Sequence, residues 1–342
     1  MRGSKVIFEM TGEEPQMSGV KRPTEKHLML FSGRSNPKLA AEVADLMGVQ
    51  LAPSRLVTYA NSEIYVRYEE SVRGSDAFVI QSMQAPINEW LMEQLIMVDA
   101  LKRASAKRIT VVAPFYPYAR QDKKHLGREP ISARLVADLF WAAGADRIMS
   151  VDLHTAQIQG FFNGPLDHLS GMPVLADYVG QKYDASKMTI VSPDAGRVRL
   201  ADAWSDTLGA PLAIIHKRHD PTVANQIKVH EVVGNVKGRT CLLVDDMVDT
   251  AGTICQAAEA LLEHGAEKVI AAATHAVLSD PATERLNATP FEEIIFTNTL
   301  PIRPDIEIPK MTVLSIAPLL AQAIHEVFED GSVTSLFRGA AV

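Results

Sequence analysis

The chain has 342 residues, and its 34 Lys and Arg against 41 Asp and Glu give a formal net charge of −7. Hydrophobic residues make up 47% of the chain and charged residues 22%, which is typical of a packed globular protein and argues against intrinsic disorder. The acidic balance argues against general nucleic-acid binding, so any anion-binding site must be a local basic cluster. No apolar run approaches the ~20 residues of a membrane-spanning helix.

The N-terminal segment, residues 1–26, lacks a sustained hydrophobic period and the apolar stretch of a signal peptide. We expect a mobile extension, and the missing export signal predicts a cytoplasmic location. The two cysteines, Cys241 and Cys255, cannot alone build a disulfide framework or a structural zinc site. We therefore expect both to be packing residues in a reducing compartment.

From His27 on, short apolar runs alternate with segments of helical periodicity. The predicted strands are Leu28–Phe31, Ala77–Gln81, Arg108–Ala113, Arg147–Val151, Met188–Val191, Leu212–Ile215, Cys241–Val244, Lys268–Ala273, Glu293–Phe296 and Met311–Ser315. The predicted helices are Pro37–Met47, Ile87–Ser105, Ser132–Ala143, Val174–Tyr183, Val198–Thr207, Thr253–His264 and Pro318–Glu329. Continuous Val/Ile/Leu runs are typical of parallel strands buried on both faces, so the alternation predicts a mainly parallel α/β architecture.

A weak internal repeat relates residues 31–48 to 191–209, and the predicted strand around Val79 to that around Leu243. Both offsets are about 160 residues, which favours two copies of one α/β domain, although all strand–loop–helix units look alike. The join falls near residues 163–173, rich in Gly, Pro and polar side chains. We expect domains at 27–168 and 169–325, followed by a C-terminal tail at 326–342.

The strongest local signal is the segment 242–253, where an apolar strand leads into Asp245 and Asp246, and the loop Asp249–Thr253 then opens a helix. Such a loop directs backbone N–H groups and threonine hydroxyls at one point, at the positive end of the helix dipole, where anions bind. The two carboxylates would repel a phosphate, and they suit the vicinal hydroxyls of a sugar instead. The segment predicts a site for a phosphorylated ribose; the alternative is an ordinary N-capped helix after an exposed acidic turn.

A second signal is a cluster of positive charge within residues 120–128 of an otherwise acidic chain. Its members are Arg120, Lys123, Lys124, His125 and Arg128. Such a run is most often a solvated surface. Here it follows the predicted strand Arg108–Ala113, and the carboxyl ends of parallel strands are where α/β proteins bind ligands.

The segment Asp245–Thr253 resembles the ribose-phosphate motif of phosphoribosyltransferases and of ribose-phosphate pyrophosphokinases (PRPP synthetases). Three further segments resemble PRPP synthetases alone: the R-Q-D-x-K stretch at Arg120–Lys124, the D-L-H stretch at Asp152–His154 and the S-P-D-x-G loop at Ser192–Gly196. Asn61–Glu63 lies where that family has an adenine-binding triplet, with Ser62 in place of the usual glycine. The matches keep their order from His27 to the C-terminus, so nearly the whole chain resembles a class I PRPP synthetase.

The resemblance implies two similar phosphoribosyltransferase-like domains with the active site between them, and a C-terminal tail, 326–342, that packs back near the first domain. It also implies magnesium-dependent transfer of the β,γ-pyrophosphoryl group of ATP to the 1-hydroxyl of ribose 5-phosphate, giving PRPP and AMP. The implied ATP-binding residues are Asn61, Ser62, Glu63, Arg120, Gln121 and Asp122, the first three contributed across a subunit boundary. The implied ribose 5-phosphate residues are His219, Asp245, Asp246, Asp249, Thr250, Ala251, Gly252 and Thr253. The implied metal-binding residues are His154 and Asp194.

Residues 214–226 lead from a predicted strand into a polar stretch with little pattern, which resembles the family's flexible catalytic loop. Lys217 stands at the catalytic lysine position, where an ammonium group is suited to stabilise charge on the transferred group. The family has K-x-R here, whereas this chain reads Lys217-Arg218-His219. His219 thus replaces the second catalytic cation, with Arg218 as its neighbouring substitute, and we expect an active enzyme that is slower or more pH-sensitive than its relatives.

Two other functions stay open on the sequence: a catalytically silent homologue that regulates an active partner, and a phosphoribosyltransferase. The departure at His219 is the only support for the first, and the second leaves the Arg120–Arg128 segment unexplained. The resemblance also implies a homo-oligomer, commonly a hexamer, with phosphate as activator and ADP as inhibitor. It implies no nucleic-acid or membrane partner.

Overall fold

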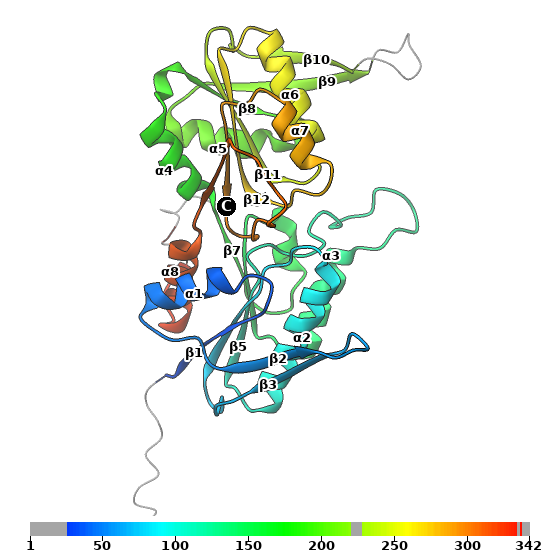
Figure 1. Ribbon diagram of the computed structural model, residues 1–342, viewed down its shortest axis with the longest axis vertical. Coiled ribbons are helices and arrows are strands. Elements are labelled where there is room, and N and C mark those ends of the chain that lie inside the picture. The colour runs from blue at the N-terminus through cyan, green and yellow to red at the C-terminus, as the bar shows by residue number, and fades with distance from the viewer. Residues whose placement is uncertain (1–25, 220–227, 334–335, 337–342) are drawn as a thin grey trace, which may run out of the picture.

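The structure is a computed structural model that describes residues 26–219, 228–333 and Leu336; the side chains of residues 217–219 and 228–230 lie outside the description. The expected N-terminal extension therefore falls almost entirely outside the described residues. Two sheets are stacked along the long axis of the molecule, one in each half of the chain (Figure 1). Within the described part, no helix is long and apolar enough to cross a membrane.

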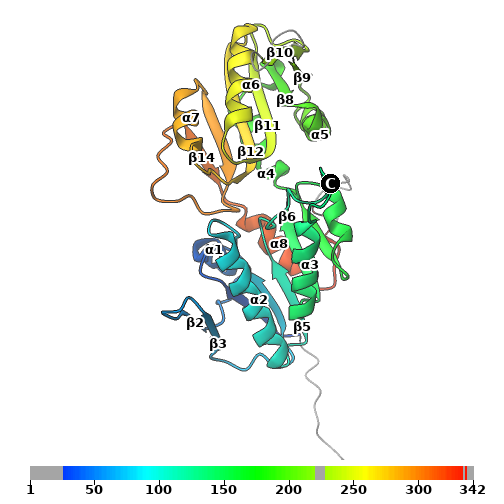
Figure 2. The ribbon, with the colours of Figure 1, turned by 90° about the vertical axis from the view of Figure 1, so that its right-hand side faces the viewer.

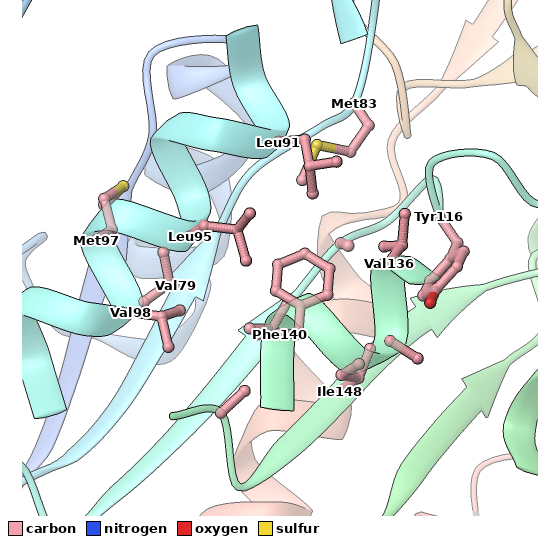
Figure 3. Packing of buried hydrophobic residues seen from close by; sticks show 14 of the residues in the cluster. Val79, Met83, Leu91, Leu95, Met97, Val98, Tyr116, Val136, Phe140 and Ile148 are labelled. Carbon is pink, nitrogen blue, oxygen red and sulfur yellow. The ribbon is translucent and has the colours of Figure 1, made fainter. Parts of the chain in front are cut away.

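The first half is built on a five-stranded, entirely parallel sheet in the order β1-β4-β5-β6-β7. These strands are Leu28–Ser32, Asp76–Ile80, Arg108–Val112, Arg147–Val151 and Leu166–Leu169. Helices α2 (Ile87–Arg103) and α3 (Ser132–Ala143) cover one face, where Leu95, Val98 and Phe140 pack against β4 and β6 (Figure 3). Helix α1 (Pro37–Met47) covers the other face.

The second half is built on a seven-stranded sheet in the order β10-β9-β8-β11-β12-β13-β14, in which only β10 runs antiparallel. These strands, from β8 to β14 in chain order, are Met188–Ser192, Leu212–His219, Lys228–Val233, Thr240–Val248, Lys268–Ala276, Glu293–Thr297 and Met311–Leu314. Helices α6 (Gly252–Glu263) and α7 (Ala282–Ala288) pack on one face. Helix α5 (Val198–Leu208) packs on the other.

The halves exchange one helix each. Helix α4 (Met172–Lys182) follows β7 of the first sheet, but its buried residues pack against strands of the second. Helix α8 (Ala317–Phe328) follows β14 of the second sheet, but it packs beside α1 on the first (Figures 1 and 2). The chain thus returns to the first half before residue 326, where the sequence analysis placed the start of the returning tail.

The predicted fold class, two similar α/β domains with mostly parallel sheets flanked by helices, is confirmed. The order β1-β4-β5-β6-β7 recurs as β8-β11-β12-β13-β14, in agreement with the internal repeat. The sequence analysis missed four strands and one helix: β2 (Ser54–Thr58), β3 (Ile64–Tyr68), β7, β10 and α7. The missed hairpin β2–β3 forms its own two-stranded sheet, and its alternating exposure leaves no continuous apolar run to detect.

Local signals explain where the long elements begin and end. The Asn36 side chain accepts a hydrogen bond from the N–H of Leu39, and Pro37 follows at the first helical position of α1. Gly48 ends that helix with a left-handed φ of 67°, which glycine adopts without steric cost. These positions match the predicted bounds of the helix.

Candidate active site

The acidic pair lies inside strand β11, which continues to Val248 instead of ending at Val244 as predicted. The side chain of Asp245 is 16% exposed and that of Asp246 7% exposed. In the parallel register Asp245 lies opposite Ala273 of β12. The two carboxylates therefore reach the boundary between the halves from the carboxyl end of a central strand, which is where open α/β sheets bind ligands.

His154 and Arg197 converge on these carboxylates from different loops. His154 Nδ1 lies 2.8 Å from Asp246 Oδ2, which joins the first half to the second. Arg197 Nε lies 2.9 Å from Asp245 Oδ1 and its Nη2 2.7 Å from Asp246 Oδ1. Arg197 Nη2 also lies 2.8 Å from His154 Nδ1. Because one ring nitrogen cannot both donate to Asp246 and accept from Arg197, the protonation state of His154 decides which contact is a hydrogen bond.

Burial and neighbouring charges drive the pKa values of the two carboxyl groups apart. Burial raises the pKa of Asp245, and the nearby charge of Asp246 raises it further. Burial opposes ionisation of Asp246 too, but its hydrogen bond with His154 and the charge of Arg197 outweigh burial and lower its pKa. Asp246 Oδ1 is buried without a hydrogen bond among the described residues, although the charge of Arg197 lies close to it.

The loop after β11 is held in place by an arginine from helix α7. Ala251 adopts a left-handed φ of 60° at the N-cap of α6, and Gly252 begins the helix, one residue earlier than predicted. Arg285 Nη1 donates a hydrogen bond to the carbonyl oxygen of Thr250 at 2.9 Å. A Cβ atom at Gly252 would lie 3.2 Å from Arg285 Nη1, so the guanidinium packs directly against the loop. The loop combines a helix N-terminus with a nearby cation, which suits an anion.

Within the segment Arg120–Asp122, the first residue contacts the loop after β11, whereas the last has a buried side chain. Arg120 Nη1 forms an ion pair with Asp249 Oδ2 at 2.7 Å, so the predicted ATP segment touches the predicted sugar-phosphate loop. Gln121 is exposed and its side-chain oxygen accepts from the hydroxyl of Ser132. Asp122 is only 4% exposed.

The buried carboxylate of Asp122 is engaged by the segment that follows His154. Its Oδ2 accepts hydrogen bonds from the Thr155 hydroxyl and from the Gln157 amide, each at 2.6 Å. Both bonds stay within the first half. The side chain therefore supports the D-L-H segment, and it does not lie open beside Arg120.

His154 and Asp194 leave donor atoms free for a metal ion. Asp194 Oδ1 accepts from the N–H of Gly196, and among the described residues no hydrogen bond or ion pair engages Oδ2 or His154 Nε2. No group of three or more His, Cys, Asp or Glu side chains is arranged around a metal position in the described part of the chain. The free carboxylate oxygen of Asp194 is the kind of ligand that Mg²⁺ prefers, since this ion is commonly held by one or two carboxylates together with water and substrate phosphates.

Asn61, Ser62 and Glu63 lie apart from these residues. They form the turn of the β2–β3 hairpin, where Ser62 has a φ of 70° and Asn61 Oδ1 accepts from the N–H of Glu63. Among the residues that the structure describes, no hydrogen bond or ion pair joins this turn to Arg120, His154 or Asp245. Ser62 and Glu63 instead line a hollow of about 630 Å³ between the hairpin and helix α2.

Lys217, Arg218 and His219 belong to strand β9, not to an irregular loop. Their backbone pairs with β10 in an antiparallel ladder that matches Lys217 with His230 and His219 with Lys228. The β9–β10 hairpin projects from the second half of the molecule (Figure 1). The side chains of these three residues, and residues 220–226 of the expected catalytic loop, lie outside the described residues.

Sequence reasoning missed two arginines of this site. Arg197 follows the S-P-D-x-G loop directly, and its position next to a candidate metal residue was the only available signal. Arg285 lies on the unpredicted helix α7, 32 residues beyond the end of the loop that it contacts, and nothing in the sequence ties the two together. Of the predicted site residues, the structure places Arg120 in contact with Asp249 and His154 in contact with Asp246.

Comparisons with known proteins match both halves. A family profile described as the N-terminal domain of ribose phosphate pyrophosphokinase matches residues 28–144, and one described as the phosphoribosyl synthetase-associated domain matches residues 216–338. A ribose-phosphate pyrophosphokinase from Streptomyces coelicolor is 67% identical over 321 residues, 94% of this chain and 99% of its own. One from Mycobacterium tuberculosis is 61% identical over 317 residues, 92% of this chain and 97% of its own. A crystal structure of phosphoribosylpyrophosphate synthetase from Mycobacterium smegmatis shares 60% identity and a TM-score of 0.84, covering 90% of this chain and 100% of that one.

Proposed function

The chain belongs to the ribose-phosphate pyrophosphokinase family, and on that premise we propose that it transfers the β,γ-pyrophosphoryl group of ATP to the 1-hydroxyl of ribose 5-phosphate. The products are PRPP and AMP. One observation carries the proposal within this chain. The acidic pair and the loop after β11 meet the Arg120 segment and His154 through contacts of 2.7 and 2.8 Å, so a sugar-phosphate site adjoins a cationic nucleotide site.

Ribose 5-phosphate binds at the carboxyl end of β11. Its phosphate lies on the loop Asp249–Thr253, where the first N–H groups of α6 are free and Arg285 adds positive charge. Asp245 and Asp246 accept hydrogen bonds from the ribose hydroxyls through their carboxyl oxygens. This arrangement orients the 1-hydroxyl toward the nucleotide.

ATP binds beside this sugar, with Arg120 and Gln121 on its triphosphate side. His154 and Asp194 would hold Mg²⁺, which would neutralise the triphosphate and so lower its repulsion toward an attacking oxygen. Arg120 is paired with Asp249 in this structure. When a phosphate group binds, this ion pair must break, or Arg120 must contact both Asp249 and the phosphate. Lys217 stabilises negative charge on the transferred group, with Arg218 and His219 beside it on β9.

The adenine end of ATP is completed by Asn61, Ser62 and Glu63 of a neighbouring copy in a homo-oligomer, a hexamer by family expectation. The hairpin turn is exposed and makes no hydrogen bond or ion pair to the site among the described residues, which supports a role toward another subunit. Phosphate and ADP act as effectors, and the enzyme works in the cytoplasm. Residues 27–168 and 169–325 serve as its two domains, with α8 of the second packing on the first.

The regulatory alternative is not favoured. Relatives of 59–67% identity over nearly the whole chain carry the enzyme's name. The acidic pair, the loop and His154 are all present and in contact with charged partners. Two positions depart from the expected pattern, His219 and Ser62.

The proposal is tested with the purified full chain, Mg²⁺, ATP and ribose 5-phosphate, counting AMP, ADP and PRPP. We expect AMP and PRPP in equal amounts, and neither product when ribose without phosphate replaces the substrate. ADP in place of AMP would indicate transfer of a single phosphoryl group. The absence of both nucleotides as products would support the silent regulator.

A further inference from the structure

The segment that carries His154 is fastened to the second half by a residue with no role assigned above. Asp152, the first residue of the D-L-H stretch, has a left-handed φ of 39°, which non-glycine residues rarely adopt. Its Oδ2 atom accepts hydrogen bonds from the N–H of Gly171, at 2.9 Å, and from the hydroxyl of Thr274. Thr274 lies on β12 of the second sheet, so this carboxylate bridges the halves.

The next residue of β12 completes the connection. His275 is 1% exposed, and its Nε2 lies 3.0 Å from the carbonyl oxygen of Val151 and 3.1 Å from that of Asp152. Because both partners are acceptors, Nε2 carries the ring proton. Nδ1 therefore accepts from the hydroxyl of Thr299, 2.9 Å away. Burial lowers the pKa of His275, in keeping with this neutral ring.

The packing around these groups leaves little freedom. The ring of Phe115, from the first half, lies edge-on to His275 with centroids 4.9 Å apart. A Cβ atom at Gly171 would lie 3.0 Å from Asp152 Oδ2 and 3.1 Å from Thr274 Cγ2. The turn at Asp152 is thus held by hydrogen bonds to its side chain, by the contacts of His275 with its backbone, and by close packing at Gly171.

This connection sits beside the acidic pair. His275 is the Cα partner of Met247 in the parallel register of β11 and β12, next to Asp246 in sequence. Asp152 is two residues before His154, whose Nδ1 lies 2.8 Å from Asp246 Oδ2. Asp246 lies on β11, and the segment that carries His154 is bonded to Thr274 and His275 on the adjacent strand β12. Both sides of the His154–Asp246 contact therefore depend on this pair of strands.

We propose that Asp152 and His275 are positioning residues for pyrophosphoryl transfer, because they lock the His154 segment onto β12 and so set His154 against Asp246. Both hydrogen bonds of the Asp152 carboxylate, from Gly171 and from Thr274, fall on its Oδ2 atom, and through this atom the side chain holds the turn that leads to His154. The inference rests on the proposed function for its kinetic test. A displacement of His154 by about 1 Å is expected to cost tenfold to hundredfold in rate.

Thr274→Val removes one hydroxyl from this connection and keeps the shape of the side chain. We expect kcat to fall about tenfold while KM for ATP and for ribose 5-phosphate changes less than about twofold. We also expect faster hydrogen exchange at the Gly171 amide, which needs no activity to measure. The matched control is Thr189→Val, since Thr189 is a buried strand threonine whose hydroxyl bonds Asn235 within the second half. Unchanged kcat and exchange in Thr274→Val would overturn the proposal.

A double-mutant cycle separates positioning from metal binding at Asp152. If Asp152 acts through Thr274, adding Thr274→Val to Asp152→Asn costs little beyond the single change. Independent, multiplying losses together with a raised Mg²⁺ requirement in Asp152→Asn would make Asp152 a metal ligand and contradict the proposal.

His275 offers a rescue experiment. His275→Gln keeps an amide donor that can reach the two carbonyl oxygens and should retain most of kcat, whereas His275→Ala should not. Equal kcat in both variants would argue against the role of His275. A wild-type chain that makes no PRPP refutes the proposed function alone, because amide exchange at Gly171 still decides whether the connection exists.

Discussion

The two halves of the molecule share one strand order. The acidic pair and the candidate phosphate loop Asp249–Thr253 belong to β11 of the second half, and the corresponding strand β4 of the first half has no such sequence after it. Strand β4 of the first half corresponds to β11 of the second, so Gln81 takes the place of Asp245. Gln81 is 1% exposed, and it bonds Ser35 and the buried Glu93. The equivalent end of β11 instead opens into the acidic pair and the Asp249–Thr253 loop.

The comparison shows that a duplicated scaffold can divide structural and chemical work between its copies. In the first half, the residues that follow β4, Gln81 and Ser82, are uncharged and bond Glu93 and the backbone of Thr299. The first half instead meets the loop after β11 through the segment that follows β5, where Arg120 pairs with Asp249. The second half keeps the site, and it depends on the first half for His154 and Arg120.

The largest effect should come from a substitution of the acidic pair on β11. Asp246→Asn removes the charge that engages His154 and Arg197, and we expect kcat to fall at least about a hundredfold. Gln81→Leu, near the equivalent place, should lower the free energy of unfolding by about 1–3 kcal/mol and leave kcat unchanged. Steady-state kinetics and urea unfolding measure both effects. A similar loss of kcat in the two variants would contradict the difference between the halves.

The residues before helices α5 and α1 offer a second contrast. Arg197→Ala leaves two buried carboxylates without their cation, so we expect the free energy of unfolding to fall by about 3 kcal/mol and KM for ribose 5-phosphate to rise. Asn36→Ala at the corresponding cap of α1 should cost only about 1 kcal/mol. Equal losses in denaturant melts would show that Arg197 is no more than a cap.

The last strand pair of each half is pinned by a charged residue. Glu293 accepts hydrogen bonds from Thr312, Tyr183, Lys182 and Tyr178. Burial alone would raise its pKa, but these bonds outweigh burial and lower the pKa to about 2. In the first half, Arg147 and Asp167 pin β6 to β7.

A lowered pKa stabilises the folded state above the unfolded pKa of the carboxyl group and loses that stabilisation as pH falls through the folded pKa. Glu293→Gln should therefore cost about 2 kcal/mol near pH 7 and progressively less from about pH 4 toward pH 2. Unfolding measured across that range tests the sign. A loss of unfolding free energy that does not decrease in acid would mean that the packing of Glu293, and not its charge, stabilises the folded state.

The smallest effect concerns the two hairpins, β2–β3 and β9–β10, which occupy equivalent places in the two halves. His219→Arg on β9 supplies a permanent cation, so we expect a few-fold faster reaction and a flatter pH–rate profile between about pH 6 and 8. An identical profile and rate would show that the departure at His219 has no kinetic consequence.

The sequence was enough for the fold where apolar runs were continuous. All ten predicted strands and all seven predicted helices occur, with bounds close to those expected. The missed hairpin β2–β3 alternates exposed and half-buried residues without a core of its own, and the short helix α7 has too few residues for a clear period.

The site was predictable where chemistry and local spacing coincide, as in Asp245, Asp246 and the following loop. Arg197, Arg285 and His275 could not be found that way, because their roles come from contacts between distant segments. Asp122 shows the reverse: its motif is conspicuous, but only the fold reveals that its carboxylate turns inward to Thr155 and Gln157. Side-chain direction depends on tertiary packing that spacing along the chain does not encode.

The exchange of α4 and α8 between the sheets makes each half a partner in the other's interior. A fragment ending at residue 169 would leave bare the apolar surface that Ala317–Phe328 covers, and a fragment starting there would carry α8 with nothing to pack on. Melting should accordingly proceed as one cooperative transition, with no separately melting half. Because each half packs a helix of the other, the relative position of the two halves, and of the residues that meet between them, is fixed by the core packing itself.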